Sequence, residues 1–295
     1  MEAKLLDMNE WEQFGGGGNG WSYYHKTDSS IMLKLNKEEI TREQSLTEYS
    51  RSKALFEAGI NCPEVIDFVT DGKRYGLTMR RIQGKKSFAR IIGDDPSRLE
   101  QTAKTFAKRS REFHSIKADT TLFQSKEEII RNSINSSEAI PEDIKRMLLG
   151  YLESLDKETF CVHGDFNPGN IIHSEDGRDY WIDLGEFAYG DPDLDIGSLV
   201  FLAKMTPAKI TEYLFHMTRE QFAEFLEIYG REYYGDRWHT PELDEKIRRI
   251  SMIKAGMSIA KRSRTALIYL PLLRGQKTRW KVILWIVDHL VRKFN

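Results

Sequence analysis

The sequence has few of the features that mark several large classes of protein. Its 295 residues include only two cysteines, Cys62 and Cys161, too few for a disulfide framework or a four-ligand zinc site, which indicates a reducing compartment. The longest clean apolar run, Val282–Val287, is far too short to span a membrane. The segment from Met1 to Phe14 carries four acidic side chains and no basic start before an apolar core, unlike a signal peptide. We therefore expect a cytoplasmic protein with no membrane association.

An excess of charge of one sign is also missing. The chain has 44 Lys and Arg residues against 45 Asp and Glu residues, for a formal net charge of -1. A dedicated nucleic-acid-binding protein is usually strongly basic, so we expect no nucleic-acid partner. Apolar types make up 40% of the residues, which is enough to build sizeable cores without disulfides or metals. At roughly 150 residues per domain, the length suggests about two domains.

Residue patterns predict a small sheet with one helix in the part of the chain before Gln83. A helix is expected from Thr41, a suitable N-cap, to Glu57, and Gly59 would stop it. The breaker-rich segment 83–86 is the candidate hinge, which gives expected domains of residues 1–83 and 84–295. The expected strands, rich in aromatic or branched residues, are Trp21–Lys26, Ile31–Leu35, Val65–Val69 and Tyr75–Met79.

The chain beyond the hinge is predicted to be mainly helical. A short strand, Thr159–Val162, and a hairpin made of segments 170–173 and 180–183 interrupt the helices. The expected helices cover 97–115, 126–138 and 142–155, and further helices follow residue 194, broken near Pro207, Gly230–Gly235, Pro241 and Pro271.

The segment His163-Gly-Asp-Phe-Asn-Pro-Gly-Asn170 carries the strongest chemical signal. Asp165 and Asn170 share a loop between two expected strands, and Asp183 follows at the end of the next expected hairpin. An enzyme that phosphorylates a hydroxyl needs one carboxylate to accept a proton, a second to hold magnesium, and a neutral oxygen to complete the coordination. Each residue alone is an ordinary turn former, but the three in this order and spacing indicate a kinase site.

A run of glycines near the N-terminus agrees with a nucleotide site. Gly15, Gly16, Gly17, Gly18, Asn19 and Gly20 form a loop that a strand follows, whereas a dinucleotide-binding loop would open a helix. A Walker A loop is excluded because it needs Gly-Lys-Ser/Thr. A glycine loop inside a strand hairpin lets backbone N–H groups approach phosphates closely. The alternative is a flexible surface turn.

Lys34 lies within the apolar strand expected to form the second half of this hairpin region, after Gly20. A lone lysine there is usually an edge charge with a packed stem, but this position also suits a phosphate-binding lysine. Such a lysine needs a carboxylate partner on the next helix. Glu48 is the best candidate, with Glu43 and Glu57 as competitors.

The sequence resembles the aminoglycoside phosphotransferase and choline-kinase-like branch of the protein-kinase-like fold. The motifs that carry the resemblance are His163–Asn170, Ile182-Asp183-Leu-Gly185 and Gly190-Asp-Pro-Asp-Leu-Asp195-Ile-Gly197. The resemblance extends from about Gly15 to Gly197. It implies an α+β, bilobal fold, with a small N-terminal lobe of antiparallel sheet and one helix and a larger, mainly helical C-terminal lobe.

The resemblance also implies an ATP-dependent small-molecule kinase with magnesium as cofactor. Asp165 would be the catalytic base, Asn170 and Asp183 the magnesium ligands, and Lys34 the lysine on the α- and β-phosphates. Glu48, the glycine loop and Met79 complete the expected nucleotide site. Asp195 is expected to support the catalytic loop, and His163 to organise it.

One departure from the protein kinases bears on the phosphoryl acceptor. Protein kinases have a lysine two residues after the catalytic aspartate, where this chain has Asn167, which favours a small-molecule acceptor.

The distribution of charge near the C-terminus also bears on the acceptor. Segment 211–245 has nine acidic residues against three arginines, and the chain from Lys246 onward has thirteen basic residues against Asp288 alone. The two segments could pair or be solvated. A polycationic aminoglycoside needs an acidic cleft, so we expect a neutral, zwitterionic or anionic hydroxyl compound instead. A catalytically weak nucleotide-binding protein and an aminoglycoside-modifying enzyme are the alternatives.

Overall fold

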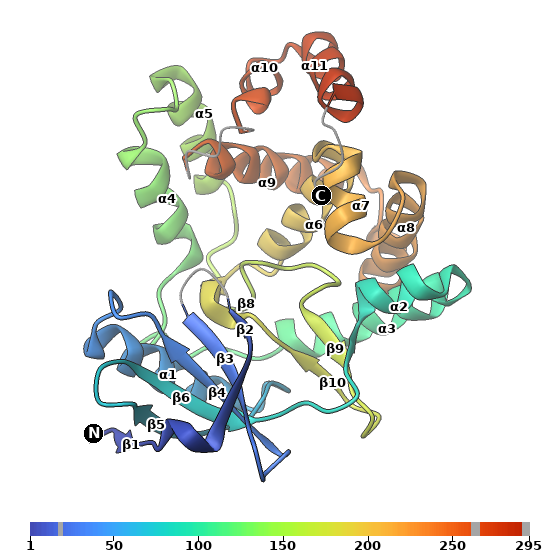
Figure 1. Ribbon diagram of the computed structural model, residues 1–295. Helices are drawn as coiled ribbons and strands as arrows, with labels where there is room; N and C mark the ends of the chain where they lie inside the picture. Colours follow the sequence, from blue (N-terminus) through green and yellow to red (C-terminus); the bar gives the residue numbers. More distant parts are fainter. Residues whose placement is uncertain (17–19, 261–265, 291–295) are drawn as a thin grey trace. The chain divides into compact units, whose positions relative to one another are not determined.

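The computed structural model describes residues 1–16, 20–260 and 266–290 and divides into two compact units (Figure 1). The first unit comprises Met1–Lys86 and Ile171–Gly185, and the second comprises Ser87–Asn170 and Glu186–Asn295. The boundary expected after residue 83, and the independence of two domains, stay predictions.

The first unit contains a six-stranded sheet in the order β1-β5-β6-β4-β3-β2, antiparallel apart from the β1–β5 pair (Figure 1). Helix α1 (Arg42–Glu57) packs on β5 and β6. Thr41 caps α1 as expected, in a capping box with Gln44. The strands are β1 (Lys4–Leu5), β2 (Trp11–Gly16), β3 (Gly20–His25), β4 (Ile31–Asn36), β5 (Val65–Thr70) and β6 (Tyr75–Arg80).

The predicted strands of this sheet are confirmed, and two further strands were not predicted. Strands β1 and β2 were missed because Trp11–Gly16 mixes polar residues with glycines and shows no alternation. On α1, Tyr49 and Ser45 are buried, whereas Phe56 is exposed. Ser45 contacts Asn36 of β4.

A short hairpin later in the chain belongs to the first unit. Strands β9 (Ile171–His173) and β10 (Asp179–Trp181) pair antiparallel, and β9 also pairs with β7 (Lys86–Ser87). Asn61 Nδ2 donates to the carbonyl oxygen of Asp179 (2.5 Å), and Asn61 in turn accepts from the backbone of Trp181 (2.8 Å). The second strand of this hairpin, which was predicted to reach Asp183, ends two residues earlier at Trp181.

The second unit is mainly helical, with one two-stranded antiparallel sheet of β8 (Phe160–Val162) and β11 (Ala188–Gly190). Its shorter helical segments are 3-10 turns. Its α-helices are α2 (Phe88–Asp94), α3 (Leu99–His114), α4 (Lys126–Ser136), α5 (Glu142–Glu153), α6 (Asp193–Met205), α7 (Ala208–Phe215), α8 (Arg219–Tyr234), α9 (Pro241–Ala260), α10 (Leu270–Leu273) and α11 (Lys277–Leu290).

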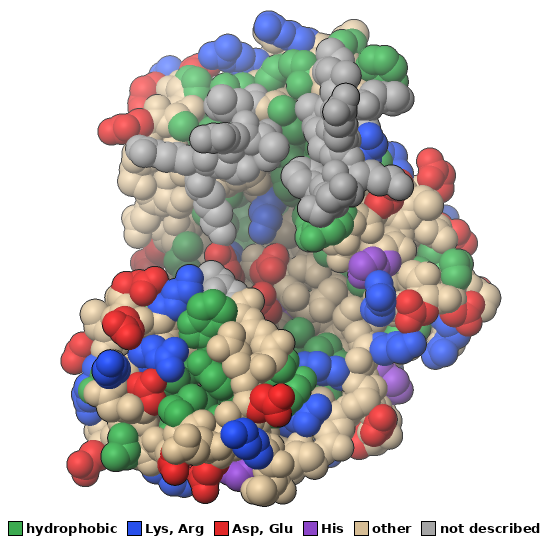
Figure 2. All heavy atoms as spheres, viewed as in Figure 1, with side chains coloured by type: hydrophobic (Ala, Val, Ile, Leu, Met, Phe, Trp, Pro, Cys, Tyr) green, Lys and Arg blue, Asp and Glu red, His purple; other side chains and the backbone are tan. Residues whose placement is uncertain are grey.

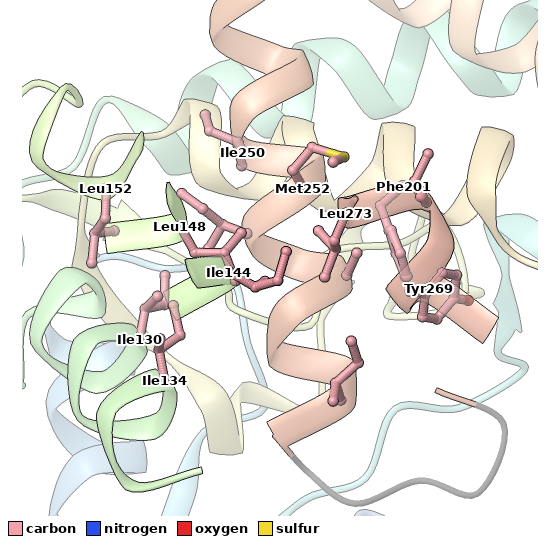
Figure 3. Close-up of a cluster of buried hydrophobic side chains, with 14 of the residues drawn as sticks. Ile130, Ile134, Ile144, Leu148, Leu152, Phe201, Ile250, Met252, Tyr269 and Leu273 are labelled. Carbon is pink, nitrogen blue, oxygen red and sulfur yellow. The ribbon is translucent and has the colours of Figure 1, made fainter. Parts of the chain in front are cut away.

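Helix α9 is the centre of the main hydrophobic core of this unit. Helices α4, α5 and α6 pack against it, and Figure 3 shows Leu148 of α5 and Ile250 of α9 pointing into the same cluster. Leu148 is fully buried. No helix among the described residues is long and apolar enough to cross a membrane.

The helix break predicted near Gly230–Gly235 is confirmed, and it lies at the end of this range, because α8 runs through Gly230 to Tyr234. A Cβ atom at Gly230 would lie 2.2 Å from the indole ring of Trp238, so the glycine permits close packing. The break occurs at Gly235, whose φ of 61° lies in the left-handed region that glycine adopts readily.

We predict that Leu148→Ala lowers the free energy of unfolding by about 2–5 kcal/mol, because it removes buried methyl groups and leaves a cavity. Leu122→Ala is the matched control, since Leu122 is 47% exposed. Urea denaturation of both variants measures the difference. Equal losses in the two variants would contradict the assigned core.

Candidate active site

Two charged side chains of the first unit form the ion pair expected from the sequence. Lys34 Nζ contacts Glu48 Oε1, and Asn36 Nδ2 donates to Glu48 Oε2 at 3.1 Å and to Ser45 Oγ at 3.0 Å. Successive strand residues face opposite sides, so Lys34 and Asn36 lie towards α1 while Leu33 and Leu35 are buried on the other face. Glu48, rather than Glu43 or Glu57, is therefore the partner of Lys34.

Asn36 is a residue of this group that the sequence reasoning missed. The signal was its position two residues after Lys34 on the same strand, which places both side chains on one face. By holding the second oxygen of Glu48, Asn36 fixes the carboxylate that holds the lysine. Lys34 remains 38% exposed, so its ammonium group stays accessible to a ligand.

The predicted glycine loop is only partly described. Gly15 and Gly16 end β2, and Gly20 begins β3, so the loop joins two paired strands. Gly17, Gly18 and Asn19 lie outside the described residues. A Cβ atom at Gly20 would lie 2.6 Å from the carbonyl oxygen of Leu35, so this glycine is needed for strand packing.

Met79 and Asp183, also in the first unit, have different surroundings. Met79 lies in β6 and packs against the buried cluster that includes Tyr49 and Phe68. Asp183 follows β10 with an exposed side chain and a φ of 57°, a left-handed conformation that is uncommon for residues other than glycine. Strained residues of this kind often belong to functional sites.

The loop between β8 and β9 brings Asp165 and Asn170 together. Asn170 Nδ2 donates to the Asp165 carbonyl oxygen (2.8 Å) and to its carboxylate Oδ2 (3.0 Å). Asn167 donates to the same carbonyl oxygen (3.0 Å) and accepts from the backbone of Gly169 (2.9 Å). These bonds hold the carboxylate of Asp165 in one orientation at a half-buried position.

The carboxylate of Asp195 anchors the backbone of this loop. Its buried carboxylate accepts hydrogen bonds from the backbone N–H groups of His163 (2.6 Å) and Gly164 (2.9 Å). His114 Nε2 lies 3.1 Å from the same carboxylate. Gly164 has a φ of 83°, and a Cβ atom there would lie 2.3 Å from the carbonyl oxygen of Glu186, so no other residue fits easily.

The environment of Asp195 favours its charged form. Burial by itself raises the pKa of this carboxyl group, but the hydrogen bond and charge of His114, with the contribution of His163 and the N–H group of Gly164, outweigh burial. The pKa of Asp195 is therefore lowered from its usual value. His114 is buried, and its Nδ1 contacts the hydroxyl of Tyr233 at 2.8 Å.

The comparisons with known proteins begin with a family match over most of the chain. The family model described as "Phosphotransferase enzyme family" matches residues 10–245. A search of curated proteins found no significant match.

Solved aminoglycoside phosphotransferases are similar in structure. A thermostable mutant of APH(4)-Ia in its apo form shares 15% identity, with a TM-score of 0.59 and 95% of each chain covered. ADP-bound APH(2'')-Ib shares 18% identity, with a TM-score of 0.58 over 94% of this chain and 92% of that chain. The type VIII aminoglycoside-3'-phosphotransferase shares 17% identity, with a TM-score of 0.58 over 84% of this chain and 94% of that chain. These likenesses show the fold and confirm the predicted α+β, kinase-like class.

We predict that Asp195→Asn lowers the free energy of unfolding by on the order of 3 kcal/mol near neutral pH, because the loop N–H groups and His114 lose a charged acceptor. The pKa of Asp195 is lower in the folded than in the unfolded protein. The charged carboxylate therefore stabilises the fold fully above the unfolded pKa of about 3.9, and this stabilisation is lost as the pH falls through the folded pKa. The difference in unfolding free energy between wild type and variant should therefore become smaller in acid. Denaturation from pH 7 to 3 measures it, with exposed Asp236→Asn as control, and a gap that does not change with pH would refute the assignment.

Proposed function

Because the chain belongs to the phosphotransferase enzyme family, we propose that it transfers the γ-phosphoryl group of ATP to a hydroxyl group of a small molecule. The observation that carries this proposal is the Asp165–Asn170 pair on a loop anchored by a buried carboxylate. Asp165 would accept the proton of the attacking hydroxyl. A base contributes most when it is held in place before the reaction begins, which the bonds from Asn170 achieve.

The Lys34–Glu48 pair supports a nucleotide triphosphate as the donor. An ammonium group held at one side by a carboxylate can bind phosphate oxygens at the other. Gly15, Gly16 and Gly20 would let the strand backbone approach those phosphates, with Met79 as a further contact of the nucleotide. Among the similar solved structures, APH(2'')-Ib is bound to ADP, and a mutant of APH(4)-Ia is bound to AMP-PNP and hygromycin B.

The donor atoms present fit a magnesium ion. Asn170 uses its amide nitrogen towards Asp165, which leaves its oxygen, the atom that Mg²⁺ requires, for the metal. Asp183 offers an exposed carboxylate. Among residues 1–16, 20–260 and 266–290 no group of three or more His, Cys, Asp or Glu side chains could hold a metal. Magnesium in kinases takes one or two protein ligands with the substrate phosphates, and when bound it neutralises phosphate charge.

The charge distribution favours a neutral, zwitterionic or anionic acceptor. Glu227 pairs with Arg231 (2.7 Å), and Glu245 pairs with Arg248 (2.7 Å) and Arg249 (2.9 Å). Acidic and basic side chains are interspersed on the face seen in Figure 2. Glu227 and Glu245 are therefore partly neutralised by arginines three or four positions away on their own helices. A polycationic substrate would need a cleft of unpaired acidic groups.

An aminoglycoside acceptor is the alternative with an observation in its favour. Solved structures of an APH(4)-Ia mutant with hygromycin B and of APH(2'')-IIa with gentamicin are similar to this chain, at 15% and 16% identity. Protein substrates are disfavoured by Asn167, whose side chain is engaged within the loop at the position where protein kinases have a lysine. A catalytically weak nucleotide-binding protein would lack the pre-positioned base.

We predict that Asp165→Asn lowers phosphoryl transfer by about a hundredfold or more while AMP-PNP still binds, because the base acts on the acceptor and not on the nucleotide. ADP release with one mixture of hydroxyl compounds measures transfer in both proteins, and calorimetry measures AMP-PNP affinity. Exposed Asp236→Asn is the control. Near wild-type ADP release by Asp165→Asn would mean that another group is the base.

We predict that Asp183→Asn weakens the magnesium-dependent binding of AMP-PNP by at least about tenfold, because a charged ligand of the cation is lost. Asparagine tolerates the left-handed backbone found at Asp183, so this variant separates charge from strain. Asn170→Ala should have a smaller effect, and exposed Asp176→Asn should have none. Titrations with and without Mg²⁺ decide, and an unchanged magnesium effect in both site variants would exclude these ligands.

A further inference from the structure

A pocket in the second unit lies directly beside the catalytic loop. It has a volume of about 70 Å³, room for a small substituent of a ligand. Its apolar wall includes Ile130 of α4 and Ile250 of α9, which Figure 3 shows in the main core cluster. Its polar and charged lining consists of Lys126, Lys254, Glu186, Asp195, Ser198 and Ser258. Two ammonium groups on a mainly apolar wall are unusual, because buried charge is costly unless paired.

Lys126 begins α4 and is almost fully buried. Its ammonium group donates to the carbonyl oxygen of Glu186 at 3.2 Å, and the Glu186 carboxylate lies 3.5 Å away. The side chain of Lys126 is only 10% exposed, whereas that of Glu186 is 48% exposed. The lysine is therefore fixed by the fold, while its carboxylate partner can turn towards solvent at little cost.

Lys254, on α9, brings a second positive charge to the same pocket. Its ammonium group donates to the carbonyl oxygen of Gly164 at 3.4 Å. The same glycine packs tightly against Lys126, since a Cβ atom on Gly164 would lie 2.5 Å from the Lys126 nitrogen. Gly164 immediately precedes Asp165, so both lysines contact the backbone that carries the proposed base.

The two carboxylates of the lining differ in what they can offer a ligand. Asp195 is committed to the N–H groups of His163 and Gly164 and to His114, so it does not neutralise a ligand in the pocket. Glu186 is the other carboxylate and pairs with Lys126. The hydroxyl groups of Ser198 and Ser258 donate to carbonyl oxygens of their own helices. Among the lining residues, Lys126 and Lys254 are therefore the ones whose charge would attract an anion.

We propose that this pocket binds an anionic substituent, a carboxylate or a phosphate, of the phosphoryl acceptor. The inference rests on the proposed function and narrows its substrate class to an anionic hydroxyl compound. An anion between the two ammonium groups gains charge-assisted hydrogen bonds, and the apolar wall accepts the adjoining carbon atoms. Because Gly164 lines the pocket and immediately precedes Asp165, an acceptor anchored there would place a neighbouring hydroxyl near the proposed base.

Three compounds with one three-carbon frame test the proposal. Glycerol 3-phosphate, glycerate and glycerol are titrated calorimetrically into the full chain saturated with AMP-PNP and Mg²⁺, at about 150 mM salt, so that diffuse surface attraction is screened at a Debye length of about 8 Å. Both anions should bind at least about tenfold more tightly than glycerol, since a charge-assisted bond contributes about 1.5–3 kcal/mol. The relative affinities of the two anions distinguish a phosphate from a carboxylate.

The variants tie the binding to the two lysines. Lys126→Met and Lys254→Met should each weaken anion binding at least about tenfold, whereas Lys254→Arg, which keeps the charge, should largely preserve it. Lys204→Met, an exposed lysine on α6, is the matched control. Melting temperatures show that each variant folds. Equal affinity for glycerol and the anions, or anion binding unaffected in both Met variants, would overturn the proposal. Failure of AMP-PNP to bind would instead contradict the proposed kinase function.

Discussion

The hydrogen bonds from loop 163–170 to the buried carboxylate of Asp195 are the constraint on which the candidate site of the second unit depends. Asp195 lies in the first turn of α6, and its oxygens accept from the backbone of His163 and Gly164. Phe166, two residues after Gly164, is buried, and its ring centroid lies 4.9 Å from that of Phe106 in α3. One polar and one apolar anchor thus fix the backbone on both sides of Asp165. The carboxylate of Asp165 can then be half-exposed without being mobile.

The first unit uses a different device to hold a charge in place. Strand alternation puts Lys34 and Asn36 on one face of β4, and α1 supplies Glu48 and Ser45 to meet them. The carboxylate is shared between an ammonium group and an amide, so it cannot swing away from either. In each unit, a proposed site residue is positioned by a neighbouring side chain: Lys34 by Glu48, and Asp165 by Asn170. Electrostatic catalysis requires charged groups that are held in place in this way before the reaction.

The sequence predicted the parts of the fold whose local signals agree with the tertiary structure. The capping residue Thr41, the stop at Gly59 and the apolar strand around Lys34 all specify their own conformation, so these elements were located correctly. The motifs at Asp165 and Asp195 were found because their residues lie close together in sequence. Asn36 was not predicted, because its bond to Glu48 depends on how α1 packs on the sheet.

The missed features depend on contacts between distant residues. Strand β2 is held by pairing with β3 and not by its own composition. Lys126 and Lys254 are separated by more than a hundred positions, and no pattern along the chain connects them. In the sequence, each lysine is one charged residue among many on an expected helix. The packing of α4 against α9 brings them to one pocket.

The most direct test of the central claim is to follow the γ-phosphoryl group itself. The protein is incubated with Mg²⁺, ATP labelled with ¹⁸O in the γ-phosphoryl group, and pools of hydroxyl compounds that are anionic, zwitterionic, neutral or cationic. Mass spectrometry then locates the label. Our account predicts that a compound gains one labelled phosphoryl group in an amount equal to the ADP formed. If the protein binds ATP but the label stays in ATP, or appears only in inorganic phosphate with every pool, the account is contradicted.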